Sequence, residues 1–96
     1  MINDTLNDRE QTHGSYVQVA NLTQALLMSM SYSKNWEELF PIQKEALHMI
    51  AVKIARILEG NADEVDHWHD VAGYATLVEQ FLRQAGPGNT PLRPEQ

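Results

Sequence analysis

A break of only a few residues separates two long amphipathic patterns in this sequence, and it limits the folds open to the chain. Apolar residues recur at helical spacing over about residues 41–59 and again over about residues 63–84. Pro41 fits the first turn of the earlier helix, and Gly60 fits its C-terminal cap. Because Gly60 and Asn61 leave so little chain between the helices, we expect the two to fold back as an antiparallel hairpin.

Each of the two predicted helices carries an apolar stripe that we expect to be buried. The earlier stripe comprises Leu47, Ile50, Ala51, Ile54, Ile57 and Leu58, and the later one comprises Val65, Trp68, Ala72, Ala75, Val78 and Leu82. This choice of stripe predicts that Trp68 lies in the core. It also predicts that His67, about 100° away around the helix, is largely exposed.

A third helical pattern lies earlier in the chain, from Tyr16 to Met30, with Ser15 as a candidate N-cap. The stretch "WEELF" that follows reads as a short turn with two aromatic anchors, Trp36 and Phe40. No segment shows the alternation typical of a strand, so the predicted class is all-α with three main helices. The predicted division is a flexible arm at residues 1–12, one helical domain at 13–85, and a flexible Pro/Gly-rich tail at 86–96.

The composition of the chain argues against some classes of binding partner. The 96 residues include 7 basic and 13 acidic side chains, a formal net charge of −6, which argues against nucleic acids and anionic membranes. The chain has no cysteine and no apolar run long enough to span a membrane, and its start, "MINDTLNDRE", is unlike a signal peptide. We therefore expect a cytoplasmic protein. Three helices give a thin core, so we also expect a homodimer or larger homo-oligomer that completes a bundle.

Four charged residues near the hairpin link form the first candidate site. Asp66 and Asp70 are four residues apart on one face of a helix, where like charges repel, and the antiparallel hairpin brings Lys53 and Arg56 toward them. One interpretation is a structural salt-bridge cluster, in which Asp70 is held by Lys53 or Arg56. The other is a site where the carboxylates hold a weak Mg²⁺ or Mn²⁺ ion and the basic pair holds phosphate.

Two histidines flank Trp68. His67 and His69 point to different sides of a helix and cannot chelate one ion together. His69 lies three residues from Asp66, and His67 lies three from Asp70, spacings that suit zinc or manganese. Helix-surface histidines that only pair are commoner, so His69 is a weak candidate metal ligand.

Two further motifs contain glycine. In "THGSY", Gly14 permits a tight backbone approach to a ligand or another chain, and the N–H groups of the helix start suit an anion. His13 and Tyr16 could add a hydrogen bond and a stacking face for a phosphate or nucleotide; alternatively the motif is a cap that only fixes the chain path, with Tyr16 in the core. In "AGYA", Gly73 weakens its helix by roughly 1 kcal/mol relative to Ala. The glycine therefore predicts a close helix crossing or a ligand.

The order and spacing of several motifs in this chain resemble those of known protein families. "THGSY", Asn35-Trp36, "QKEALHMIAVKIARILEG" and "DHWHDVAGYATLVEQFL" resemble a family of small phage and prophage proteins of unknown function, over roughly residues 8–83. More distantly, "KIARI" followed by Asp-x-x-x-Asp and "GYA" is similar to MazG-like all-α nucleotide pyrophosphohydrolases.

The MazG-like resemblance implies a dimeric or tetrameric bundle in which acidic residues hold Mg²⁺ against a nucleoside triphosphate. Water then attacks the link between the α and β phosphates. By position, Asp70 matches the acidic residue that opens the family's last ligand motif, Asp66 matches an acidic neighbour one turn earlier, and Lys53 and Arg56 match the basic pair of the preceding helix. The chain departs from the family's Glu-x-x-Glu motif, for which the nearest stand-ins are Glu45 with His48, or Glu37 with Glu38.

Two functions are therefore expected. One is a nucleotide-binding or pyrophosphohydrolase-like phage protein with an incomplete metal site, whose catalytic competence the sequence leaves open. The alternative is a non-enzymatic phage protein that binds and modulates a host or defence protein through its acidic surface and the turn around Trp36.

Overall fold

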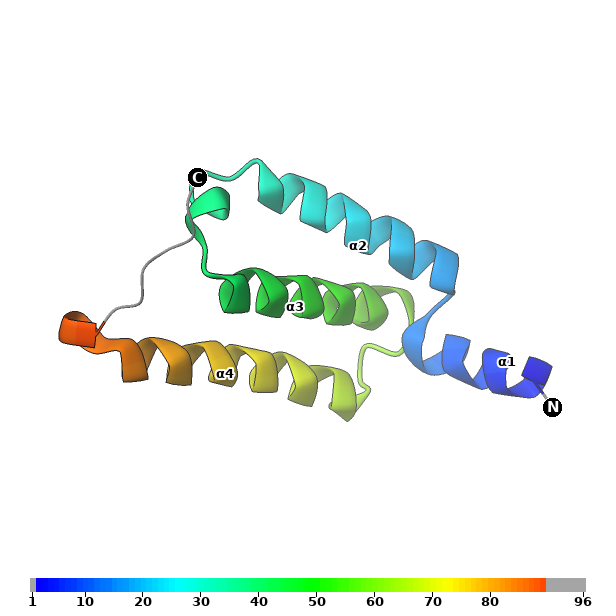
Figure 1. The fold of residues 1–96 in the computed structure, drawn as a ribbon. Coiled ribbons are helices and arrows are strands. Elements are labelled where there is room, and N and C mark those ends of the chain that lie inside the picture. The colour runs from blue at the N-terminus through cyan, green and yellow to red at the C-terminus, as the bar shows by residue number, and fades with distance from the viewer. Residues whose placement is uncertain (1, 90–96) are drawn as a thin grey trace.

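The computed structural model describes residues 2–89, and helices make up most of that range (Figure 1). The elements are α1 (Ile2–His13), α2 (Tyr16–Ser31), the short 3-10 helix η1 (Trp36–Glu38), α3 (Pro41–Glu59) and α4 (Val65–Asn89). No strand occurs within residues 2–89, so the all-α class is confirmed. The predicted helix at 41–59 matches α3, and the predicted antiparallel pairing of α3 with α4 is also confirmed.

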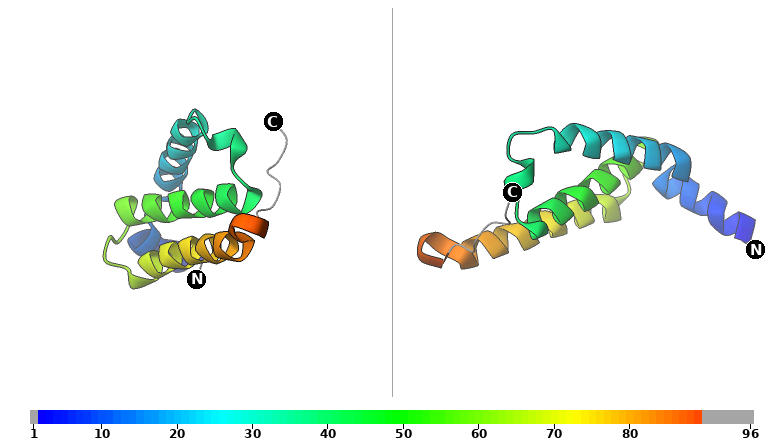
Figure 2. Two further views of the ribbon diagram at one scale, coloured as in Figure 1. Left: turned by 90° about the vertical axis from the view of Figure 1, so that its left-hand side faces the viewer. Right: turned by 45° about the horizontal axis from the view of Figure 1, so that its top comes forward.

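Helix α3 lies between α2 and α4 and packs against both (Figures 1 and 2). The chain reverses direction between α2 and α3 and again between α3 and α4, so α2 and α4 both run antiparallel to α3. Helix α1 leads away from the end where α2 begins, and contacts both α2 and α3. The structure therefore places residues of α3 within reach of every other α-helix.

Small side chains let α3 take this central place. Ala46, Ala51 and Ala55 are buried on α3, so its neighbours can approach its backbone closely. Just before α3, Phe40 is 3% exposed and packs edge-on against Phe81 of α4, with ring centroids 5.4 Å apart. This aromatic pair fixes the later part of α4 against the start of α3.

Two glycines join the α1–α2 corner to the α3–α4 loop. Gly14 has φ +85°, and a Cβ there would lie 2.7 Å from the carbonyl carbon of Glu59. A Cβ on Gly60 would lie 2.5 Å from both the Gly14 nitrogen and the Thr12 oxygen. The sequence predicts a close approach of Gly14 to a ligand or another chain, whereas the backbone that Gly14 meets is that of Glu59 in its own chain.

The largest departure from the sequence prediction concerns α4. His67 is 2% exposed and Trp68 is 55% exposed, so both predictions for these residues are wrong. Helix α4 faces α3 with a stripe of buried or half-buried residues: His67, Val71, Tyr74, Val78 and Phe81. The predicted stripe contained more apolar residues and had the same helical spacing. Hydrogen bonding of His67 to a backbone oxygen lets the more polar stripe turn inward.

Several smaller predictions also fail. On α3, Ala51 and Ile57 are buried as predicted, but Leu47 and Ile54 are each 37% exposed and Leu58 is 65% exposed, because α2 and α4 do not cover that side. Tyr16 is 83% exposed, which excludes it from the core. By contrast, Ser15 is the N-cap residue of α2 as predicted, although its side chain makes no capping hydrogen bond.

The ends of the domain differ from the prediction as well. The sequence predicts a flexible arm over residues 1–12, whereas residues 2–13 form α1; its Ile2 and Leu6 are exposed and leave no apolar stripe to detect. Helix α4 continues to Asn89, past the predicted start of the tail at Gly86. The rest of the predicted tail, residues 90–96, lies outside the described residues.

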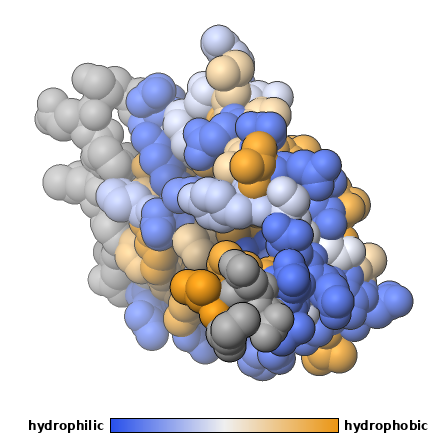
Figure 3. Space-filling model, turned by 90° about the vertical axis from the view of Figure 1, so that its right-hand side faces the viewer, coloured by the Kyte–Doolittle hydropathy of each residue, from blue (hydrophilic) through white to orange (hydrophobic). Residues whose placement is uncertain are grey.

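The surface of the described part is mixed. Figure 3 views the end of the molecule where α1 lies, and shows apolar side chains scattered among hydrophilic ones. Among residues 2–89, no helix is both long enough and apolar enough to cross a membrane.

The close backbone contact at Gly14, and the open space at Gly73, predict opposite effects for alanine substitutions at these two positions. Gly14→Ala should lower the free energy of unfolding by roughly 1–3 kcal/mol, because alanine is strained at φ +85° and meets the Glu59 backbone. Gly73→Ala should raise it by about 0.5–1 kcal/mol, because nothing lies within 4 Å of a Cβ there and helix propensity improves. Urea denaturation measures both changes in the free energy of unfolding. Equal changes for the two variants would contradict a close backbone contact at Gly14.

Candidate functional site

Of the four charged residues predicted to cluster near the hairpin link, Lys53 and Asp70 form an ion pair with each other. Lys53 Nζ lies 2.8 Å from Asp70 Oδ2, and the side chains are 10% and 41% exposed, respectively. The hydrogen bond from Lys53 lowers the pKa of Asp70 below its ordinary value of 3.8. The predicted pairing of Asp70 with a basic residue of α3 is therefore confirmed for Lys53. Arg56 takes no part in it and faces elsewhere.

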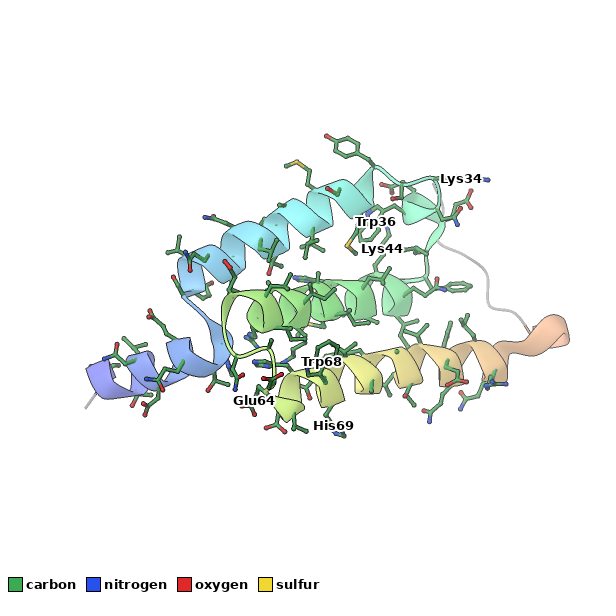
Figure 4. All side chains as sticks on the ribbon, turned by 180° about the vertical axis from the view of Figure 1, so that it is seen from behind. Lys34, Trp36, Lys44, Glu64, Trp68 and His69 are labelled. Carbon is green, nitrogen blue, oxygen red and sulfur yellow. The ribbon has the colours of Figure 1, made fainter. Side chains whose placement is uncertain are left out.

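The candidate metal ligands do not converge in the described structure. Asp66 and His69 are exposed, and Figure 4 shows His69 pointing away from α3. Glu45 and His48 lie 3.7 Å apart, but on α3 near α2 rather than beside Asp70. Within residues 2–89, no group of three or more His, Cys, Asp or Glu side chains is placed to hold a metal ion. A weak Mg²⁺ or Mn²⁺ site stays a prediction.

A cavity of about 690 Å³ lies between α1, α2 and α3. Its lining includes His13, Tyr16 and Arg56, three of the four residues that the sequence selects for phosphate or nucleotide binding. The fourth, Lys53, faces α4 and is engaged by Asp70. The other lining residues are Leu6, Arg9, Glu10, Gly14, Val19, Ala20, Thr23, Gln24, His48 and Val52.

The cavity wall carries positive charge, and two buried polar atoms of its residues lack hydrogen bonds within the described part of the chain. Burial is the largest cause of a lowered pKa at His13, followed by the positive charge of Arg56 and, to a lesser degree, His67, Arg9 and Lys53. Within the described residues, neither the Nδ1 atom of His13 nor the Oγ1 atom of Thr23 makes a hydrogen bond, although both atoms are buried. The positive charge of this wall suits an anionic ligand.

His67 supports this wall from behind. Its Nε2 lies 3.0 Å from the Thr12 carbonyl oxygen, and because a carbonyl only accepts, Nε2 carries the proton and donates. Its ring packs edge-on against His13, with centroids 4.9 Å apart. His67 therefore fixes the position of His13.

Sequence reasoning missed three residues of this region. Arg9 could have been found from its spacing, since it precedes His13 by four residues and shares a helix face with it. Thr23 lies within the apolar stripe of α2 and passes for a core residue. His67 has no local signal, because its partner is 55 residues away in the chain.

Two shallower hollows lie outside the cavity. One, of about 520 Å³, includes Trp36 and Lys44, whose ammonium lies 5.6 Å from the centroid of the Trp36 ring. Figure 4 shows these two side chains beside each other between η1 and α3. The other, of about 510 Å³, includes His69, Asp70 and Gly73.

Comparison with known proteins places the chain in a family without assigning an activity. The model of a family described as a domain of unknown function, DUF6378, matches residues 2–82, and the chain belongs to this family. No curated protein and no solved structure matches the chain. A family of unknown function is therefore shown, while the phage origin and the MazG-like relationship stay predictions.

The lowered pKa of Asp70 predicts a pH-dependent effect of Asp70→Asn. A carboxyl whose pKa is lowered by folding stabilises the fold above its unfolded pKa, and this stabilisation is lost as the pH falls through the folded value. The variant should therefore unfold at lower urea concentration at pH 7, where Lys53 loses its counter-charge. The difference from wild type should shrink as the pH falls through the lowered folded pKa of Asp70, below 3.8, and disappear once wild-type Asp70 is itself protonated.

Asp66→Asn is the matched control for this experiment. Asp66 lies one turn earlier on α4, is exposed, and makes no ion pair within the described residues. An equal loss of stability in both variants would contradict a specific role for the Lys53–Asp70 pair.

Proposed function

We propose that this member of a family of unknown function binds a phosphate-bearing small molecule of the nucleotide class in the cavity between α1, α2 and α3. One observation carries the proposal. His13, Tyr16 and Arg56, chosen from the sequence for this chemistry, line a single cavity although they come from three different helices or their connections. A volume of about 690 Å³ lies within the range typical of small-molecule sites.

Charge supports a phosphate ligand. Arg9 and Arg56 line the cavity, and a guanidinium group can bind two phosphate oxygens at once. The pKa of His13 is lowered by burial and by Arg56 ahead of other cations, so an anion beside it would relieve this effect. Glu10 is the one acidic residue of the cavity lining in a chain of net charge −6. The cavity is thus a local exception to the chain's negative charge.

The rest of the lining suits a nucleobase. Tyr16 is 83% exposed and offers an aromatic face, while Val19, Ala20 and Val52 supply apolar surface. Aromatic stacking on a base stabilises binding by roughly 1–3 kcal/mol. A nucleotide uses both the apolar and the cationic parts of this lining.

The proposal is one of binding. Metal-assisted hydrolysis, which the MazG-like resemblance implies, would need carboxylates gathered around Mg²⁺. In the described residues Asp70 is paired with Lys53, outside the cavity lining, and Glu45 lies apart from it. Hydrolysis therefore has less support than binding.

Thermal denaturation with added ligands tests this function. Nucleoside mono-, di- and triphosphates and pyrophosphate should be screened with and without Mg²⁺ or Mn²⁺. A true ligand at 100 times its Kd should stabilise the fold by roughly 2.7 kcal/mol. Arg56→Gln should weaken that binding at least roughly tenfold, because it removes hydrogen bonds to a charged group.

Arg83→Gln is the matched control, because Arg83 is exposed on α4 and absent from the cavity lining. Binding should also raise the pKa of His13, which NMR titration of the histidine ring follows. Stabilisation that survives Arg56→Gln, or no stabilisation by any of these compounds, would overturn the proposal.

A second candidate function, binding of another protein, is supported by the surface around Trp36. The hollow at Trp36 lies beside exposed Glu37 and Glu38, and Lys44 Nζ lies 3.9 Å from Glu37 Oε2, which makes this a charged and aromatic surface suited to contact with a host or defence protein. Trp68→Phe leaves Trp36 as the sole tryptophan, so its emission reports binding of a purified candidate protein. Unchanged emission on complex formation would exclude this surface.

A further inference from the structure

We propose that α4 binds α4 of a second copy of this chain, antiparallel, through an exposed stripe independent of the cavity. The α4 stripe consists of Val65, Trp68, Ala72, Ala75, Glu79 and Leu82, all of which are exposed. Val65 is 74% exposed, Trp68 55% and Leu82 42%, which is unusual for large apolar side chains aligned on one helix.

The spacing of the α4 stripe is that of a helix–helix interface. Its members follow one another at alternating intervals of three and four residues, the pattern of a coiled-coil seam. The stripe that packs on α3 shows the same alternation from His67 to Phe81. Helix α4 therefore carries two seams, one of which contacts α3 while the other has no partner within the described residues.

The large residue of the α4 stripe is held in place. The Nε1–H of Trp68 donates to the Ala62 carbonyl oxygen at 2.7 Å, which fixes the indole at the start of α4. An ordered, exposed tryptophan loses little conformational freedom when a partner covers it.

Self-complementarity identifies the partner as a second copy. If two α4 helices run antiparallel about a point between residues 73 and 74, Val65 of one lies opposite Leu82 of the other, and Ala72 lies opposite Ala75. Small residues then meet at the centre, where the helices approach most closely, Trp68 lies opposite Glu79 on each side of it, and Val65 and Leu82 meet at both ends. The same pairs recur on each side of the two-fold axis, as an isologous interface requires.

Charge favours the antiparallel orientation. The same register places Glu64 opposite Arg83 of the second copy, whereas a parallel pair would place Glu64 against Glu64 and Glu79 against Glu79. The polar member of the stripe, Glu79, already has a cation, since Arg83 Nη2 and Nε lie 2.9 and 3.0 Å from its Oε2. Glu79 therefore does not enter the interface as an isolated charge.

Neighbouring residues of α3 widen the contact. A helical projection of the hairpin, with Lys53 facing Asp70, places Ile54 and Leu58 on the same side as the α4 stripe, and they are 37% and 65% exposed. A stable interface buries roughly 800 Å² on each partner, more than a single narrow seam supplies. The α3 residues bring the contact toward that size and make the assembly a pair of hairpins.

Light scattering of the full chain tests the proposal at about 100 μM protein. Wild type should have twice the 10.9 kDa mass of one chain. Ala72→Glu combined with Ala75→Glu should yield a monomer with unchanged helical circular dichroism, because both residues are exposed in the single chain. Gln80→Glu, which adds a charge to an exposed position of α4 outside the stripe, should stay dimeric. A monomeric wild type, or a dimer that survives the double substitution, overturns the proposal.

Cysteine pairing tests the orientation, since the chain has no cysteine of its own. A mixture of Val65→Cys and Leu82→Cys chains should form a disulfide-linked heterodimer on mild oxidation. Neither variant alone should crosslink, because in the antiparallel register its two cysteines lie roughly 25 Å apart. Efficient crosslinking of Val65→Cys with itself would contradict the antiparallel interface.

Discussion

The rest of the structure depends on the backbone contact between the α1–α2 corner and the α3–α4 loop. Gly14 and Gly60 meet at a distance that no side chain could share, and the Thr12 oxygen accepts hydrogen bonds from both the Asn61 backbone and the His67 ring, each at 3.0 Å. One carbonyl thus links the end of α1, the loop after α3 and the first turn of α4. The contact holds α1 against α3, so that α1 forms one wall of the open cavity, and it orients His13 through His67.

The same contact explains which parts of the fold the sequence could predict. The α3–α4 hairpin and the Lys53–Asp70 pair follow from short links and helical spacing, both of which are local. The inward face of α4 does not, because two stripes on this helix have the same spacing and only a distant oxygen decides between them. Burial of His67 needs the Thr12 carbonyl, 55 residues away, so no window of sequence around His67 contains the reason for it.

The candidate site was predictable to a similar extent. Arg56, His13 and Tyr16 could be chosen by residue type, because guanidinium, imidazole and an aromatic ring suit a nucleotide. Their meeting in one cavity could not be predicted, because α1 has no apolar stripe and reads as an arm. Thr23 was hidden for a related reason, since a threonine on a buried stripe looks like packing until its hydroxyl is found without a hydrogen bond.

Helix α3 separates the two proposed surfaces. Lys53 and Arg56 are three residues apart, yet Lys53 is engaged by Asp70 of α4 while Arg56 lines the cavity with α1 and α2. Burying a lysine is unfavourable unless it is paired, so Asp70 must remain with Lys53 and cannot also serve the cavity. The positive charge offered to a ligand therefore comes from Arg56 and Arg9. The α4 stripe lies on the far side of the Lys53–Asp70 pair from the cavity. Binding in the cavity and pairing through α4 thus draw on separate sets of residues, with α3 as their shared scaffold.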